Sequence, residues 1–208
     1  MYKLLNDVHA KATDFGKEII PDSIEHYKVL SYQYDGYWTD IGNIYSFFEA
    51  NIALTEAIPP FNLFDSAQTI YTRPRMLPPA KISGTLIDRA IIAEGSIIHA
   101  ASVTQSVIGI RSRIGKDTVV KNVYIMGCDY YETIDQINEK IKAGKPILGI
   151  GERCVIEDAI VDKNCSIGND VVIRGGAHLE KTDHPLYTIK DNIVVIKKGA
   201  VIPNGFVI

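Results

Sequence analysis

The sequence predicts a mostly β fold: a parallel left-handed β-helix over residues 81–208, preceded by the α/β tail of another domain. Branched aliphatic residues recur every six positions along this stretch, a spacing that neither the helical period nor strand alternation produces. Turn-forming residues stand between these positions, as in IAEGS, IGKDT and IPNGF, and they suit tight corners. Such a period indicates a repeat architecture in which equivalent residues of successive coils stack.

The aliphatic residues that carry the period fall into short runs at this spacing: Ile92 and Ile98; Ile108, Ile114 and Val120; Ile150 and Ile156; Val161, Ile167 and Ile173; Ile196, Ile202 and Ile208. We expect each of these side chains to point into the coil. Residues 127–149 and 174–195 interrupt the period. We expect both to be loops extruded from corners, where solenoids accept insertions and often carry function.

The N-terminal part lacks the six-residue period. Residues 2–11 and 44–55 have helical patterns, the second with Asn43 as a plausible N-cap. Tyr27–Tyr34 alternates like a strand, and the following Asp35-Gly36 marks a turn.

Residues 58–80 lie between the N-terminal part and the predicted β-helix. They include two Pro-Pro pairs, so they are predicted to be an extended linker. One strand and a few helices are too little to complete a mixed α/β core. We therefore expect residues 1–57 to be the C-terminal remnant of a larger domain whose beginning is absent.

Composition limits the function classes. The net charge of −3 gives no electrostatic reason to expect nucleic acid or an anionic membrane as partner. Cys128, Cys154 and Cys165 follow no CxxC spacing, which fits a reduced protein. The charged N-terminal residues contain no apolar run long enough for a signal peptide or membrane span. We therefore expect a cytoplasmic location.

Several blocks of the sequence resemble the C-terminal half of ADP-glucose pyrophosphorylase, also called glucose-1-phosphate adenylyltransferase. They are DFGKEIIP (14–21), DGYWTDIGNIYSFFEAN (35–51), RPRMLPPAK (73–81), IMGCDYYET (125–133), LGIGERCVIEDAIVDKNCSIG (148–168) and VVIKKGAVIPNG (194–205). The block 125–133 is similar to the plant and cyanobacterial branch in particular. The blocks occur in family order along nearly the whole chain.

The resemblance implies an enzyme that makes ADP-glucose and pyrophosphate from ATP and glucose 1-phosphate, for glycogen or starch synthesis. It implies Mg²⁺ as cofactor, a homotetramer under allosteric control, a Rossmann-like nucleotidyltransferase domain and a regulatory β-helix. The family's glycine-rich ATP loop, catalytic aspartate and sugar-phosphate lysine have no counterpart in these residues. We therefore expect this chain to be inactive alone, and a non-catalytic module for oligomerisation or effector binding is the alternative.

By resemblance, Asp14, Phe15, Trp38 and Asp40 belong to the glucose 1-phosphate pocket, and Asp40 is also the metal ligand. A hard carboxylate oxygen suits Mg²⁺, while aspartate and an aromatic face suit sugar hydroxyls and the sugar ring. Structural alternatives exist for each residue. Asp14 would also serve as a helix N-cap, Asp40 as a turn residue, and the two aromatics as core residues.

By the same resemblance, Lys163 and Lys197 bind a phosphorylated effector such as 3-phosphoglycerate. Lysine provides the fixed cation that phosphate and carboxylate groups need. Lys198 would add to this anion site, and Arg75 and Lys81 are weaker candidates. Each of these residues has the alternative of an ordinary solvated surface charge.

Three histidines raise another class of function. Hexapeptide-repeat acyltransferases use a histidine base, and related trimers bind zinc through histidines. His178 and His184 fall in the second interruption, whereas His99 falls in the first coil. We therefore expect these histidines not to converge on one site.

Overall fold

The computed structural model describes residues 2–208, which form two compact units that meet at Gly36 and Tyr37. Each unit is described by itself. No helix among the described residues is long and apolar enough to cross a membrane.

The first unit is helical. Leu4–Val8 (η1) and Phe15–Ile19 (η2) are π-helical segments, and η2 continues directly into α1 (Ile20–His26). The helix predicted over residues 2–11 is thus confirmed over part of its length. The strand predicted at Tyr27–Tyr34 is wrong, since this segment is exposed and belongs to no sheet. Its alternation requires a neighbouring strand, and no segment within residues 2–208 provides one.

The second unit begins with a helix packed against a sheet. Asn43 caps α2 (Ile44–Ile52) as expected, because its Oδ1 accepts the Ser46 N–H at 2.8 Å. The short η3 (Ala53–Thr55) ends this helical stretch. Phe48 and Ile52 of α2 share an apolar cluster with Ile160 and Ile193 of the sheet.

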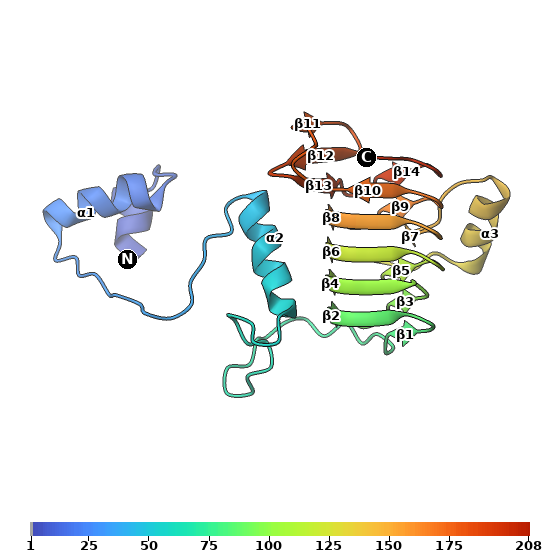
Figure 1. Cartoon of the computed structure of the whole chain (residues 1–208). Coiled ribbons are helices and arrows are strands. Elements are labelled where there is room, and N and C mark those ends of the chain that lie inside the picture. Colours follow the sequence, from blue (N-terminus) through green and yellow to red (C-terminus); the bar gives the residue numbers. More distant parts are fainter. Residues whose placement is uncertain (1) are drawn as a thin grey trace. The chain divides into compact units, whose positions relative to one another are not determined.

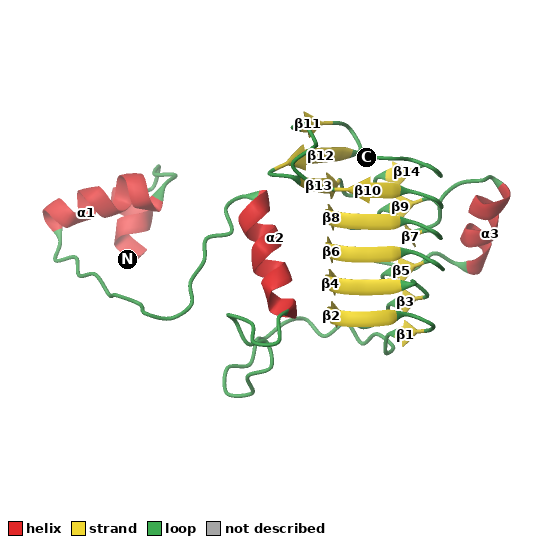
Figure 2. Ribbon diagram, in the orientation of Figure 1, coloured by secondary structure: helices red, strands yellow, loops and turns green. Residues whose placement is uncertain are grey.

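Residues 56–80 contain turns and extended backbone but no helix or strand. From Lys81 onward the chain coils into the predicted β-helix (Figures 1 and 2). The predicted fold class, mostly β with a parallel left-handed β-helix, is confirmed.

Two sheets form the sides of the helix. One has six strands in the order β1-β3-β5-β7-β9-β14; their bounds are Lys81–Ile82, Ile97–Ile98, Arg113–Ile114, Gly149–Ile150, Ser166–Ile167 and Val201–Ile202. The other runs β11-β12-β13-β8-β6-β4-β2 with β10 beside β8; their bounds are Thr182–Asp183, Tyr187–Lys190, Ile193–Ile196, Val155–Val161, Val119–Ile125, Ser102–Ile108, Leu86–Ile92 and Val172–Arg174. Pairing is parallel except within the β11–β12–β13 hairpins.

The core consists of three columns of stacked aliphatic side chains, one for each side of the coil. The first contains Ile82, Ile98, Ile114, Ile150, Ile167 and Ile202. The second contains Ile87, Val103, Val120, Ile156 and Ile173, and the third Ile92, Ile108, Ile125, Val161 and Ile196. Apart from the first members of the columns, these side chains are buried.

One corner of the coil is tighter than the six-residue period suggests. Arg89, Gln105, Asn122 and Asp158 turn it with single residues in the left-handed region, at φ values of 45°, 48°, 54° and 49°. Core positions on either side of this corner, such as Val103 and Ile108, are therefore five residues apart. An ordinary coil consequently takes 16 or 17 residues rather than three full hexapeptides, as the pairs Ile98–Ile114 and Ile150–Ile167 show.

The first interruption is an excursion that leaves the stack intact. Residues 127–149 carry α3 (Ile134–Lys142), which starts with a capping box between Thr133 and Gln136. Ile114 pairs with Ile150 across this excursion, so the coil resumes in register.

The second interruption is shorter than residues 174–195. Its centre is the β11–β12 hairpin, but β13 already pairs in parallel with β8, and Ile193 and Val194 are buried. The corrected excursion therefore ends before Ile193. The six-residue period did not predict that the coil resumes here, because β13 also pairs with β12 in an antiparallel hairpin.

Candidate functional site

Asp14 and Phe15 begin the η2 segment of the first unit. Asp14 Oδ1 accepts the Lys17 N–H at 2.9 Å, so the carboxylate acts as the N-cap that was the structural alternative. The Phe15 side chain is 46% exposed and so is available to a ligand.

Trp38 and Asp40 belong to the second unit. Trp38 is 78% exposed, which excludes ordinary core packing for it within this chain. Asp40 Oδ1 accepts the Gly42 N–H at 3.0 Å, the bond of a turn residue. Its other oxygen has no hydrogen-bond partner in the described chain.

A magnesium ion takes one or two protein carboxylates and completes its octahedron with water and phosphate oxygens. Asp40 offers one exposed carboxylate with a free oxygen, so the chemistry of this residue fits a single-ligand role. Among residues 2–208 there is no group of three or more His, Cys, Asp or Glu side chains placed to hold a metal.

Lys163 and Lys197 lie at one corner of the β-helix. Each follows the end of a strand, and these strands, β8 and β13, are neighbours. The Gly199 N–H donates to the Lys163 carbonyl at 2.9 Å, which links the two turns. The structure thus brings together the two lysines that the sequence placed in an effector site.

Both lysines form ion pairs with aspartates that sequence reasoning missed. Lys163 Nζ lies 2.7 Å from Asp129 Oδ1, and Lys197 Nζ lies 2.6 Å from Asp183 Oδ1. The hydrogen bond from Lys163 lowers the pKa of Asp129, and the bond from Lys197 lowers that of Asp183. The aspartates come from the two excursions, so no local spacing signalled these pairs.

The other cations predicted as candidates have separate places. Lys198 stands close enough to Asp129 to contribute to the lowering of its pKa, so it joins the lysine corner. Lys81 is exposed in β1, and Arg75 is exposed in the segment before it.

The three histidines do not converge on one site, although His99 lines the groove described below. His99 follows β3, whereas His178 and His184 lie in the second excursion. The His184 ring stacks on Tyr187 at 4.7 Å and its Nδ1 accepts the Leu186 N–H, which are structural roles.

The three cysteines are free and buried. Burial raises the pKa of Cys165 to about 12 and also raises the pKa values of Cys128 and Cys154. Thiols in this state are poor nucleophiles and poor metal ligands.

A groove that sequence reasoning did not find runs between the α3 excursion and the six-stranded sheet. Its volume is about 470 Å³, and cationic residues from both sides line it, among them Arg113, Lys116 and Lys145. Its signal in the sequence is weak, because Arg113 and Lys116 lie far from Lys145 along the chain, and only the folding of the excursion brings them together.

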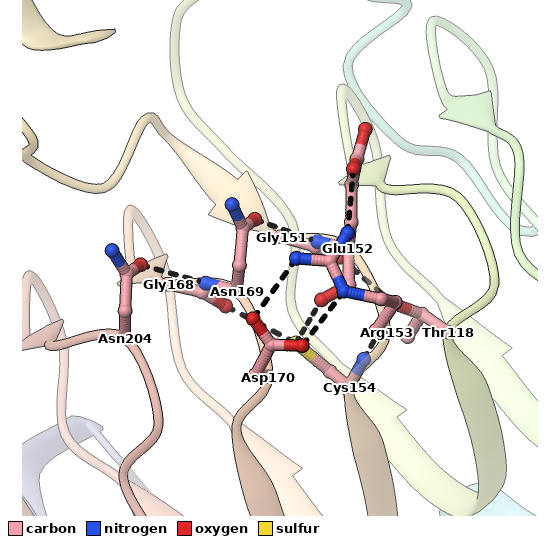
Figure 3. Close-up of polar contacts among 9 residues, drawn as sticks. All are labelled: Thr118, Gly151, Glu152, Arg153, Cys154, Gly168, Asn169, Asp170 and Asn204. Carbon is pink, nitrogen blue, oxygen red and sulfur yellow. Dashed lines mark hydrogen bonds and ion pairs between the residues drawn. The ribbon is translucent and has the colours of Figure 1, made fainter.

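One edge of the groove is a ladder of turn residues (Figure 3). Asn204 Oδ1 accepts the Asn169 N–H at 2.8 Å, and Asn169 Oδ1 accepts the Glu152 N–H at 2.9 Å. Arg153 makes a two-pronged bond to Asp170 at 2.7 and 2.9 Å. That bond raises the pKa of Arg153, which stays charged.

Comparison with known families matches almost the whole chain. Residues 75–207 match the family model described as the GLGC left-handed parallel beta-helix domain. Residues 2–57 match the model described as nucleotidyl transferase. The two matches follow each other in one chain, in the order that the sequence blocks predict.

Proposed function

Since the chain belongs to the family of the GLGC left-handed parallel β-helix domain, we propose that it is part of a glucose-1-phosphate adenylyltransferase. The proposed reaction joins ATP and glucose 1-phosphate into ADP-glucose and pyrophosphate, for glycogen or starch synthesis. One observation carries the proposal: a nucleotidyl transferase match over residues 2–57 precedes this β-helix in the same chain. A β-helix alone would leave acyltransferases open, since fold does not define function.

Within that reaction, Asp14, Phe15 and Trp38 bind the sugar phosphate. Exposed aromatic faces pack on a sugar ring, and a carboxylate accepts hydrogen bonds from its hydroxyls. The exposure of Phe15 and Trp38 supports this role, because neither ring is consumed by a core. Asp14 Oδ1 caps η2, and Oδ2 lies 3.8 Å from Lys17 Nζ, so a sugar hydroxyl would share this exposed oxygen with the lysine.

Asp40 is the proposed holder of Mg²⁺. When bound, Mg²⁺ neutralises the negative charge that develops on the phosphoryl group. The protein's own part is to present the Asp40 carboxylate in a fixed direction, which the hydrogen bond from the Gly42 N–H supports.

The 208 residues contain no glycine-rich nucleotide loop. We therefore expect the purified chain alone to release no pyrophosphate from ATP and glucose 1-phosphate with Mg²⁺. When it is mixed with a separately expressed N-terminal half of an ADP-glucose pyrophosphorylase, turnover should appear. In that mixture Asp40→Asn should lower kcat roughly 100-fold, because electrostatic stabilisation of the transition state is lost.

Asp35→Asn is the matched control, since Asp35 is an exposed carboxylate five residues earlier that the proposal leaves without a role. It should leave kcat unchanged. Turnover by the chain alone would contradict the need for the missing loop. A mixture without turnover would count against the adenylyltransferase, and equal effects of the two substitutions would remove Asp40 from the metal site.

A second candidate, an effector-binding module, rests on the lysine corner. Lys163, Lys197 and Lys198 gather there, and a phosphorylated effector such as 3-phosphoglycerate carries the complementary charge. The two functions are compatible if the chain is part of a longer enzyme, and they are rivals if it acts as it stands. Assembly into a homo-oligomer through the β-helix is part of the same proposal.

A further inference from the structure

We propose that the groove between α3 and the six-stranded sheet binds a small phosphate monoester with an apolar or sugar body. This site is separate from the lysine corner. It does not depend on the adenylyltransferase reaction.

The place of the groove follows from the excursion. In Figure 1, α3 stands beside the strands β5, β7 and β9. The chain returns from α3 through Gly144 to Ile147, and this return forms one wall opposite Arg113 and Ile114 of β5. A volume of about 470 Å³ lies within the range of small-molecule sites.

The charge of the lining selects an anion. Arg113, Lys116 and Lys145 face the groove, and none of them forms an ion pair within residues 2–208. The carboxylate of the lining is Glu152, and Arg153 already holds it at 3.1 Å. The groove is therefore electropositive. Its three cations have no ion-pair partner in the described chain, while its one carboxylate, Glu152, is neutralised by Arg153.

The asparagine ladder adds neutral donors to these cations. Asn169 and Asn204 use their Oδ1 atoms as acceptors for backbone N–H groups, which assigns the Nδ2 groups as free donors. Both residues line the groove. Figure 3 shows their amide nitrogens pointing to the same side, away from the backbone ladder. Two parallel amide donors complement phosphate oxygens, which only accept hydrogen bonds when ionised.

The apolar residues of the lining indicate that the ligand carries a carbon body as well as a phosphate. Ile97, Ile141, Pro146 and Ile147 provide apolar surface beside the cations. Gly151 and Gly168 leave the floor free of side chains, and a Cβ added at Gly151 would lie 2.5 Å from the Gly168 carbonyl oxygen. An ion without a carbon body would leave this apolar surface in contact with water.

The test is titration calorimetry of the full 208-residue chain with phenyl phosphate, inorganic phosphate and phenol. Phenyl phosphate should bind more tightly than either of the others, since it alone offers both parts of the ligand. Arg113→Gln and Lys145→Gln should each weaken its binding by about tenfold, the effect of losing one charge-assisted hydrogen bond.

Lys142→Gln is the matched control, because Lys142 is an exposed cation on the same excursion outside the lining. The affinity of the Lys142→Gln variant for phenyl phosphate should stay within about twofold of that of the parent chain. Thermal melts verify that each variant is folded. Absence of binding, equal effects of the groove and control substitutions, or loss of binding in a Lys163→Gln/Lys197→Gln variant instead would overturn the site. Equal affinity for inorganic phosphate would overturn the ligand class.

Discussion

At the corner that follows β8, two lysines from neighbouring coils each meet an aspartate from an excursion. An anionic effector bound there, as proposed above, would compete with Asp129 and Asp183 for these cations. Mild acid does not neutralise these two carboxylates, because the lysines lower their pKa values from the ordinary value of about 3.9. The carboxylates stay ionised at every pH near neutrality.

Asp129→Asn and Asp183→Asn should therefore strengthen the binding of 3-phosphoglycerate. We expect an increase of roughly two- to fivefold for each, the modest scale of exposed ion pairs. Lys163→Gln should weaken binding, and Lys121→Gln, at an exposed lysine of β6, should not. Calorimetry at low salt measures these changes. Unchanged affinity in both aspartate variants would show that Lys163 and Lys197 do not bind the effector.

The resemblance to a family predicted the cations of this corner, but their partners could not be predicted. Lys163 was recognised by motif, whereas Asp129 lies 34 positions away and meets it only through the coil. The groove escaped sequence reasoning for the same reason. Arg113, Lys145 and Asn204 carry no common motif, and their convergence requires knowing how α3 folds back on the sheet.

At the scale of elements, the corner of single left-handed residues is under local strain. A left-handed backbone costs about 1–2 kcal/mol for residues with a Cβ, and least for asparagine and aspartate. Asn122 has φ of 54° and donates to Asp158 Oδ1 at 2.6 Å, so it links the corners of two coils.

Asn122→Val should destabilise the fold by about 2–3 kcal/mol, the sum of backbone strain and a lost hydrogen bond. Asn122→Gly is the matched variant, since glycine accepts this conformation and loses only the hydrogen bond. It should cost about 1 kcal/mol. Urea unfolding measures both. Equal losses in the two variants would mean that backbone strain has no part in this corner.

The elements were predicted well where one local rule decides them. Asn43 caps α2, and the aliphatic positions of the period stack as expected. The tight corner was missed because Arg89 and Gln105 are not typical left-handed residues. The strand at residues 27–34 was wrong because alternation reports a side-chain pattern, while a strand also needs a partner.

At the scale of the molecule, the apolar core belongs to the second unit. Both apolar clusters among the described residues consist of residues from Ile44 onward. A chain of residues 37–208 should therefore unfold cooperatively, with a Tm within about 3 °C of the parent chain. Calorimetry of both chains checks this, and loss of the cooperative transition would show that residues 2–36 are needed for the β-helix to fold.

The α3 excursion leaves and re-enters the stack at one corner. Cys128 N–H still donates to the Ile110 carbonyl at its start, and Gly149 N–H donates to the Cys165 carbonyl at its end. The length of the inserted segment is thereby uncoupled from the register of the coils. Asp129 and Tyr131 still bond to the coil, through Asn164 and the Gly95 carbonyl, so the start of the excursion is constrained. Changes in α3 itself can alter what this face of the molecule binds while the coils beneath it keep their pairing.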